Sequence, residues 1–186
     1  MVALSHTWGT FPHERALTYP CSRLIPNPDD TLYRGITIHA PAQVVFRWLC
    51  QMRVAPYSYD WVDNFGRQSP RRLTPGLEQL ALGQEVMRDF ELVDFAQDQH
   101  LTLRVKRGSL LLRFCGDFAV SYCIIDRGDG SCRLLVKVVG RYPSRLWGWL
   151  IRRIMPWGDL IMMRCQLLNF KKLAEQTARE LQGCAV

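Results

Sequence analysis

The C-terminal stretch from Pro143 to Gln182 constrains the fold more than any other part of the chain. Within it, mostly apolar residues recur at steps of three and four, which places them on one stripe of an α-helix. The stripe consists of Leu160, Met163, Leu167, Phe170, Ala174, Thr177 and Leu181. The opposite side is mostly polar, with Lys171, Lys172, Glu175, Gln176 and Arg179. A stripe of this length needs a broad apolar surface to cover it, so we expect an upstream sheet that packs on this helix.

Two helix-breaking residues lie inside this stretch. A proline within a helix removes a hydrogen bond and clashes with the preceding turn, at a cost of roughly 3 kcal/mol. Pro156, followed by Gly158, therefore predicts a kink or break that separates Ser144–Met155 from Gly158–Gln182.

The sheet begins with an alternating segment, Leu32–His39, which is the first predicted strand. The period then changes at Pro41, a residue that suits the first turn of a helix, and apolar residues continue at helical spacing from Val44 to Met52. The aromatic segment Tyr57–Phe65 predicts a second, shorter helix. The chain thus places two short helices directly after the first strand.

After Gly83 the period becomes two, and strand-like segments follow one another closely. The predicted strands are Gln84–Arg88, Phe90–Phe95, Leu101–Val105, Leu110–Phe114, Asp117–Ile125 and Arg133–Tyr142. Sequential strands with short links pair antiparallel. We therefore expect an α+β fold in which a curved, seven-stranded antiparallel sheet wraps around the C-terminal helix.

The length of 186 residues fits one domain. We assign residues 31–182 to this domain and 183–186 to a tail. Residues 1–30 show no sustained period, and the prolines at 20, 26 and 28 predict an extended arm or loop there.

The formal net charge of +7 arises mainly from arginine, because only four of the 24 basic residues are lysines. The arginines are spread from Arg15 to Arg179 without a dense basic run, which is typical of a solvated surface. We therefore expect no nucleic-acid partner.

Seven cysteines in no regular spacing, several within apolar segments, favour a reducing compartment. The first 18 residues lack the pattern of a secretory signal, and no apolar run of about 18 uncharged residues is present. These features predict a soluble, cytoplasmic protein.

Motifs for metal or cofactor chemistry are missing from the sequence. The four histidines are far apart, and there is no HExxH, no paired CxxC and no GxSxG. The glycines at 128 and 130 read as a hairpin turn, because a phosphate-binding loop would need a helix start after them. We expect no metal and no cofactor.

Asp60 and Asp63 lie in the aromatic stretch, where an apolar wall could raise the pKa of a carboxyl group enough for general base catalysis. Such an aspartate also serves as a helix cap or pairs with an arginine. We retain Asp60 and Tyr59 as catalytic candidates, and no acid–base pair stands out.

A concave sheet that a helix covers but does not fill leaves a cavity suited to small hydrophobic molecules. The candidate ligand contacts are Tyr57, Trp61, Phe118, Tyr122, Val136, Met163, Leu167 and Phe170. Residues of this kind at this spacing also make up an ordinary hydrophobic core.

The segment Ser144–Met155 combines tryptophan and arginine, namely Trp147, Trp149, Arg145, Arg152 and Arg153. This mixture is found on helices that lie on a membrane interface. Alternatively, the rings cap the open end of the sheet.

Three stretches carry a family resemblance: ITIHAPAQVVFRWL at 36–49, YSYDWVDN at 57–64 and PWGDLIMM at 156–163. Together with the order of elements, they resemble the SRPBCC superfamily, which includes START-like lipid carriers, polyketide cyclases and dehydratases, and birch-pollen-allergen-like proteins. The similarity covers residues 31–182 and looks closest to uncharacterised bacterial members. The resemblance implies the helix-grip fold, a seven-stranded antiparallel sheet gripping a C-terminal helix with a ligand cavity between them.

The resemblance does not imply a reaction, because one scaffold supports carriers and enzymes. Our first hypothesis is a binding protein for a small hydrophobic or aromatic molecule, lipid-like or polyketide-like. The alternative is a cyclase- or dehydratase-like enzyme that uses Asp60 or a cavity tyrosine. A third is a membrane-surface or protein-interaction module. The oligomeric state stays open.

Overall fold

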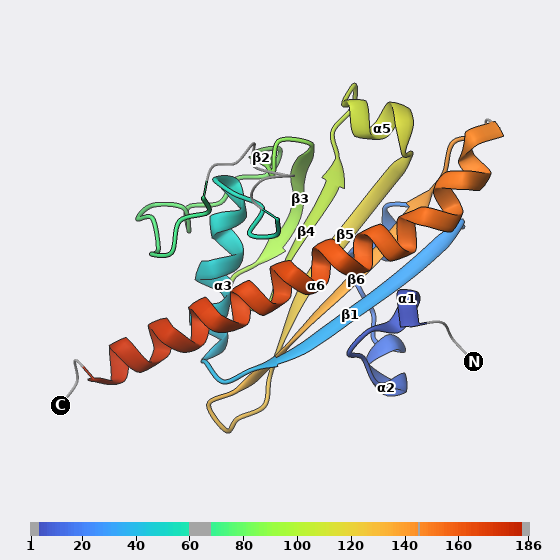
Figure 1. Cartoon of the computed structure of the whole chain (residues 1–186). Coiled ribbons are helices and arrows are strands. Elements are labelled where there is room, and N and C mark those ends of the chain that lie inside the picture. The colour runs from blue at the N-terminus through green and yellow to red at the C-terminus, as the bar shows by residue number, and fades with distance from the viewer. Residues whose placement is uncertain (1–3, 60–67, 145, 184–186) are drawn as a thin grey trace.

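The computed structural model describes residues 4–59, 68–144 and 146–183. They form an α+β fold with a six-stranded antiparallel sheet, in the order β1-β6-β5-β4-β3-β2, and a long C-terminal helix, α6, that crosses one face of the sheet (Figure 1). The strands are β1 (Asp30–Ile38), β2 (Glu85–Val86), β3 (Phe90–Ala96), β4 (His100–Val105), β5 (Asp117–Asp126) and β6 (Cys132–Arg141). The helices are α1 (Leu4–Thr7), α2 (Pro12–Arg15), α3 (Ala42–Cys50), α5 (Leu110–Phe114) and α6 (Leu146–Gly183), with 3-10 turns η1 (Pro20–Arg23) and η2 (Gln51–Arg53).

One of the seven predicted strands, Leu110–Phe114, is wrong, because this segment is the short helix α5. Ser109 has the extended backbone of a helix N-cap, and its Oγ accepts a hydrogen bond from the Leu112 N–H at 3.1 Å. Gly108 turns the chain just before it, with a φ of +81°. A short apolar run fits either period, and here the serine cap decides for helix.

Of the kink or break predicted at Pro156, the break is absent. Helix α6 runs from Leu146 to Gly183 with Pro156 inside it, although its ribbon bends in its N-terminal part (Figure 1). Pro156 is buried, and its carbonyl accepts a hydrogen bond from Arg34 Nη2 of β1 at 3.3 Å. Contacts of α6 with the sheet therefore offset the local penalty of the proline.

The sheet has two covered faces. The inner face packs against α3 and α6 in the main core, to which β5 and β6 contribute Phe118, Val120, Tyr122, Leu134, Val136 and Val138. The alternate residues Ala119, Leu135 and Val139 point outward and are also buried. They pack with Tyr19, Cys21 and Ile25 of the N-terminal segment, which explains why β6 reads as nearly continuous apolar sequence.

The N-terminal segment forms short helical turns rather than an extended arm: α1 packs beside β1 and α6, and the part from α2 to η1 lies on the outer face. Glu14 of α2 pairs with Arg133 of β6, with Oε1 and Nε 2.7 Å apart. The Cys21 N–H donates to Ser121 Oγ of β5 at 2.9 Å. These polar contacts fix the segment across the middle strands of the sheet.

The cysteines in the described part of the chain are all free, and each is buried or half-buried. Burial raises the pKa of the Cys50 and Cys123 thiols to about 12 and that of Cys132 to about 11. These side chains thus act as small hydrophobic residues.

Within the described ranges, no helix has the length and apolar character needed to cross a membrane.

Candidate functional site

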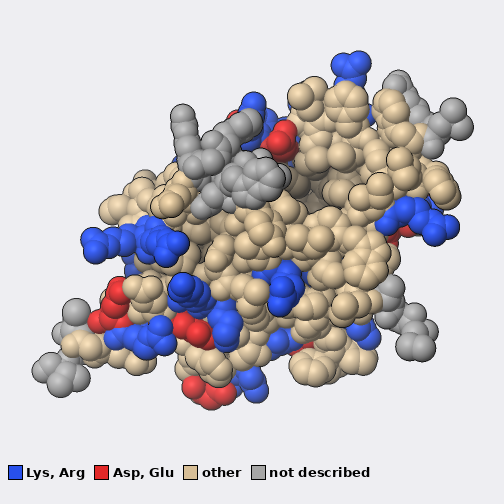
Figure 2. Space-filling view, in the orientation of Figure 1, with Lys and Arg blue, Asp and Glu red and all other residues tan. Residues whose placement is uncertain are grey.

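A cavity of about 150 Å³ lies between the inner face of the sheet and α6. Figure 2 shows a hollow beside α6 on this face of the molecule. The cavity is lined by Pro56, Ser58, Met87, Phe90, Leu111, Phe118, Val120, Tyr122, Val138, Met155, Asp159, Met162, Met163 and Gln166. Most of these side chains are apolar, and only a few bring a polar atom.

Two periodicities build the lining. Alternate residues of β5 face inward, so that Phe118, Val120 and Tyr122 form the floor. Residues of α6 at steps of three and four face the cavity, from Met155 to Gln166. Methionine is unbranched and flexible, so the four methionines in the lining can adapt to ligands of different shape.

The first polar feature is a hydrogen-bonded pair that joins the sheet to the helix. The fully buried Tyr122 hydroxyl donates to Gln166 Oε1 at 2.8 Å, and Gln166 Nε2 donates to the Pro56 carbonyl at 2.6 Å. Burial, with a further contribution from the charge of Asp159, raises the pKa of Tyr122 far above its ordinary value. The phenol is therefore neutral, and it holds a fixed orientation at the cavity floor.

The second polar feature is a buried ion pair. Asp159 Oδ2 of α6 lies 2.7 Å from Nη2 of Arg34, which is fully buried on the inner face of β1. The same guanidinium donates to the carbonyls of Ser5 at 2.8 Å and Tyr33 at 2.9 Å. Among the described residues its Nε has no hydrogen-bond partner.

Desolvation dominates the titration of this pair. It raises the pKa of the Asp159 carboxyl despite the opposing attraction of Arg34, and the nearby charge of Asp30 adds to the rise. Desolvation likewise lowers the pKa of Arg34, against the attraction of Asp159. A carboxyl group of this kind beside an apolar cavity can accept a hydrogen bond from a ligand or exchange a proton with it.

The structure divides the predicted ligand contacts into two groups. Phe118, Tyr122 and Met163 line the cavity. Val136, Leu167 and Phe170 are fully buried core residues outside its lining. Tyr57 lies in the core between Trp48 and Phe170, with ring centroids 5.9 Å and 5.4 Å away.

The catalytic candidates fall elsewhere. Tyr59 is 39% exposed, so it is no part of the cavity lining. Asp60 lies outside the described residues, as do Asp63 and the predicted ligand contact Trp61. The role of Asp60 therefore stays a prediction.

Sequence reasoning missed several lining residues, namely Pro56, Ser58, Met87, Phe90, Leu111, Met155, Asp159, Met162 and Gln166. A signal for Asp159 is nevertheless present, since it is the sole acidic residue between Pro143 and Ala174. An isolated acid within an apolar helix face indicates a buried partner. Its partner Arg34 lies 125 positions away, so only the folded chain brings the two together.

Metal ligation has no support in the described part of the chain, where no three His, Cys, Asp or Glu side chains group together. The polar side chains in the cavity lining are one carboxyl group, one phenol, one amide and the Ser58 hydroxyl, around an otherwise apolar space.

Solved structures with the same arrangement of helices and strands exist at low sequence identity. A hypothetical protein from Helicobacter pylori matches with a TM-score of 0.56 and 12% identity, over 85% of this chain and 95% of that one. The protein MLL2253 from Mesorhizobium loti matches with a TM-score of 0.53 and 14% identity, over 79% and 98%. The chain shares their fold.

A weaker match is a norcoclaurine synthase point mutant from Thalictrum, solved with a transition-state analogue, with a TM-score of 0.47 and 10% identity over 80% of this chain and 95% of that one. A likeness at that score carries no argument about chemistry. No protein-family model and no curated protein matches the chain. The order of elements and the two stronger matches are consistent with a helix-grip type of architecture, with six strands among the described residues where seven were expected.

Proposed function

We propose that the protein binds a small hydrophobic or aromatic molecule in the cavity between the sheet and α6. The observation that carries this proposal is the cavity itself, an apolar space with a few fixed polar groups at its wall. An apolar cavity of about 150 Å³ holds a molecule about the size of benzene. A larger lipid-like or polyketide-like ligand would insert one ring or chain and leave the rest at the open side.

The polar groups favour a ligand with a hydrogen-bond donor. The Tyr122 hydroxyl and the Gln166 amide already form hydrogen bonds within the protein, so they have little hydrogen-bonding capacity left for a ligand. Asp159 engages Arg34 through Oδ2, and its other carboxylate oxygen is the natural acceptor for a ligand hydroxyl or amine. We therefore expect ring compounds with a hydroxyl or amino group to bind more tightly than the bare hydrocarbons.

A cavity-filling substitution tests the proposal with N-phenyl-1-naphthylamine, a neutral probe whose fluorescence rises in apolar surroundings. Val120→Trp places a large ring in the lining, and Val54→Trp makes the same change at an exposed position. We expect Val120→Trp to weaken probe binding about tenfold or more, and Val54→Trp to leave it unchanged. A folded Val120→Trp variant, judged by near-ultraviolet circular dichroism, that binds the probe like wild type contradicts the proposal.

Native mass spectrometry identifies the ligand. The protein is purified from its own host under mild conditions, weighed intact and then extracted under denaturing conditions. The expected result is a stoichiometric apolar molecule that is lost from the Val120→Trp variant.

A second candidate function, proton transfer in a cyclase- or dehydratase-like enzyme, is favoured by the raised pKa of Asp159 beside the cavity. Incubation with the extracted molecule or its open-chain precursor separates the two functions. An enzyme returns a chemically changed product, and Asp159→Asn abolishes this turnover while naphthylamine binding persists. A carrier returns the molecule unchanged.

A further inference from the structure

The outer side of the first half of α6 carries a second apolar stripe. Its members follow one another at steps of three and four: Trp147, Leu150, Ile154, Trp157 and Ile161. Each is between 40% and 58% exposed, although large apolar side chains at this spacing normally pack against a partner. The cavity-facing residues of α6 are a different set, so this helix has two apolar sides.

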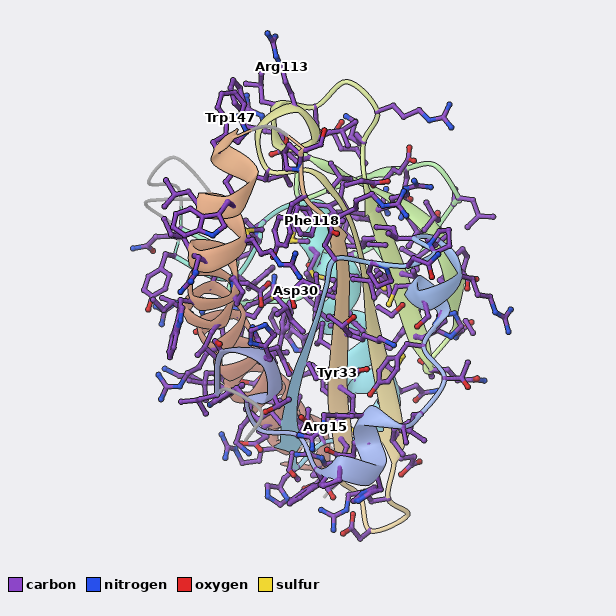
Figure 3. The ribbon with its side chains drawn as sticks, turned by 90° about the vertical axis from the view of Figure 1, so that its right-hand side faces the viewer. Arg15, Asp30, Tyr33, Arg113, Phe118 and Trp147 are labelled. Atoms are coloured by element: carbon purple, nitrogen blue, oxygen red, sulfur yellow. The ribbon has the colours of Figure 1, made fainter. Side chains whose placement is uncertain are left out.

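Helix α5 extends the exposed stripe. The rings of Phe114 and Trp147 are in contact, with centroids 6.1 Å apart, and Leu110 is 68% exposed. Trp147 of α6 and Arg113 of α5 lie together at one end of the molecule (Figure 3). We call this continuous area, made of Leu110, Phe114 and the α6 stripe with its neighbour Trp149, the α5–α6 apolar surface.

The charged residues within the two segments that carry this surface are all basic, and an acidic residue from another segment, Asp29, lies beside Arg152, from which its carbonyl accepts a hydrogen bond at 3.0 Å. Residues 105–116 and 146–158 contain no Asp or Glu, whereas Arg107, Arg113, Arg152 and Arg153 are exposed there. The Arg113 guanidinium lies 5.8 Å from the Phe114 ring centroid, and that of Arg153 lies 5.4 Å from Trp149. Figure 2 shows a broad tan area over this end of the molecule with blue side chains at its edge.

We propose that the α5–α6 apolar surface docks on an anionic phospholipid bilayer, with the first half of α6 lying in the plane of the interface. Tryptophan and arginine are the residues that settle at the headgroup level, where the ring enters the acyl boundary and the cation meets lipid phosphate. Anionic lipid attracts each nearby arginine, which adds to the burial of the apolar stripe.

A second copy of the chain is the main competing occupant, because a stripe with this spacing can form a helix–helix seam. A two-fold dimer through this surface would place the same arginines against each other without acidic partners in the two segments. Like charges that face each other across an interface oppose association. Charge complementarity therefore favours an anionic lipid surface over a second copy of the chain as the occupant.

Docking would bring the cavity next to the bilayer. Leu111 of α5 and Met155 and Met162 of α6 line the cavity, and they belong to the same two helices that carry the exposed surface. The docking inference stands on the exposed surface alone and does not require that the cavity holds a ligand.

Vesicle co-sedimentation tests the inference on the full chain. The vesicles contain phosphatidylcholine either alone or with about 30% phosphatidylserine. We expect binding to the anionic vesicles that weakens with added salt, and a partition constant about tenfold lower for Trp149→Ala/Trp157→Ala. The control Leu82→Ala/Leu181→Ala removes two comparably exposed leucines that do not belong to the surface and is expected to bind like wild type.

Three results would overturn the inference. The first is no binding to anionic vesicles at low salt. The second is unchanged binding by the double tryptophan variant with a wild-type thermal melt. The third is a concentration-dependent dimer, seen by sedimentation velocity, that the same variant dissociates, because the second copy is then the occupant. The Val120→Trp variant is expected to bind vesicles like wild type, so failure of the cavity proposal would be seen separately.

Discussion

At the scale of single residues, the most consequential interaction is the ion pair between Arg34 and Asp159. Arg34 is fully buried and the Asp159 side chain is 12% exposed, and for a pair this far removed from water the desolvation cost can exceed the gain from its attraction. A gain in folding stability therefore does not explain why the chain contains this ion pair. It does place one carboxyl group at the cavity wall and ties α6 to β1 at the level of Pro156.

Breaking this pair from one side should be strongly destabilising. Arg34→Met leaves Asp159 as an unpartnered buried carboxyl, and we expect a loss of about 3–5 kcal/mol in the free energy of unfolding in urea at pH 7. The double variant Arg34→Met/Asp159→Leu removes both charges and is expected to recover to within about 1 kcal/mol of wild type. A single variant as stable as wild type would show that the pair is not buried in solution.

The Glu14–Arg133 pair on the outer face predicts a pH dependence. Burial alone would raise the pKa of Glu14, but hydrogen bonds from Arg133 and the Phe11 N–H and the charge of Arg133 outweigh it and lower the pKa below its usual 4.5. The folded state thus gains stability above pH 4.5 that is lost as the pH falls through the folded-state pKa.

The test is the variant Glu14→Gln, which we expect to be about 1–3 kcal/mol less stable than wild type at pH 7. The difference should shrink steadily as unfolding is repeated at pH values below 4.5. A difference that stays constant down to acid pH would mean that the carboxylate of Glu14 contributes nothing through its charge.

At the scale of elements, the sequence predicted strands and helices where the period was long and clear. The strand ending at Ile38, the helix after Pro41 and the strands β3 to β6 all lie within two residues of their expected bounds. The prediction for the α5 segment was wrong because three consecutive leucines have no period. The residue that favours a helix there is Ser109, whose hydroxyl caps it.

The site was less predictable than the fold. Phe118 and Tyr122 could be chosen because alternation within a strand fixes which side chains face inward. On α6, the core residues Leu167 and Phe170 could not be distinguished from the cavity-lining residues Met162 and Gln166. A helical stripe does not show where the sheet curves away from the helix and leaves a space. The Arg34–Asp159 pair depends on how α6 crosses β1, which no local pattern encodes.

The N-cap of α5 gives a direct test at this scale. Ser109→Ala removes the acceptor for the Leu112 N–H and should cost about 1 kcal/mol of local helix stability, while Ser109→Asp retains a cap. Amide hydrogen exchange of Leu112 and Arg113 is expected to become about fivefold faster in the alanine variant only. Equal exchange in both variants would contradict the capping role.

At the scale of the whole molecule, the chain uses both faces of one sheet for different purposes. The outer face is closed by the N-terminal segment, as Tyr19 and Cys21 pack on Leu135 and Val139. The inner face is covered by α6 but not filled, which leaves the cavity. One end of α6 adds an exposed apolar and basic surface beside it. This division fits a protein that takes up a hydrophobic molecule, and we propose that it does so at a lipid surface.

Methionine-methyl NMR during a titration with naphthalene tests the central proposal most directly, because four of the six methionines line the cavity. We expect saturable shifts of the Met87, Met155, Met162 and Met163 methyl signals with one common affinity. Met52, which is fully buried outside the lining, should shift less. Val120→Trp should abolish the shifts. If no methionine signal shifts saturably up to the solubility limit of naphthalene, the cavity does not bind apolar molecules and the proposed function is wrong.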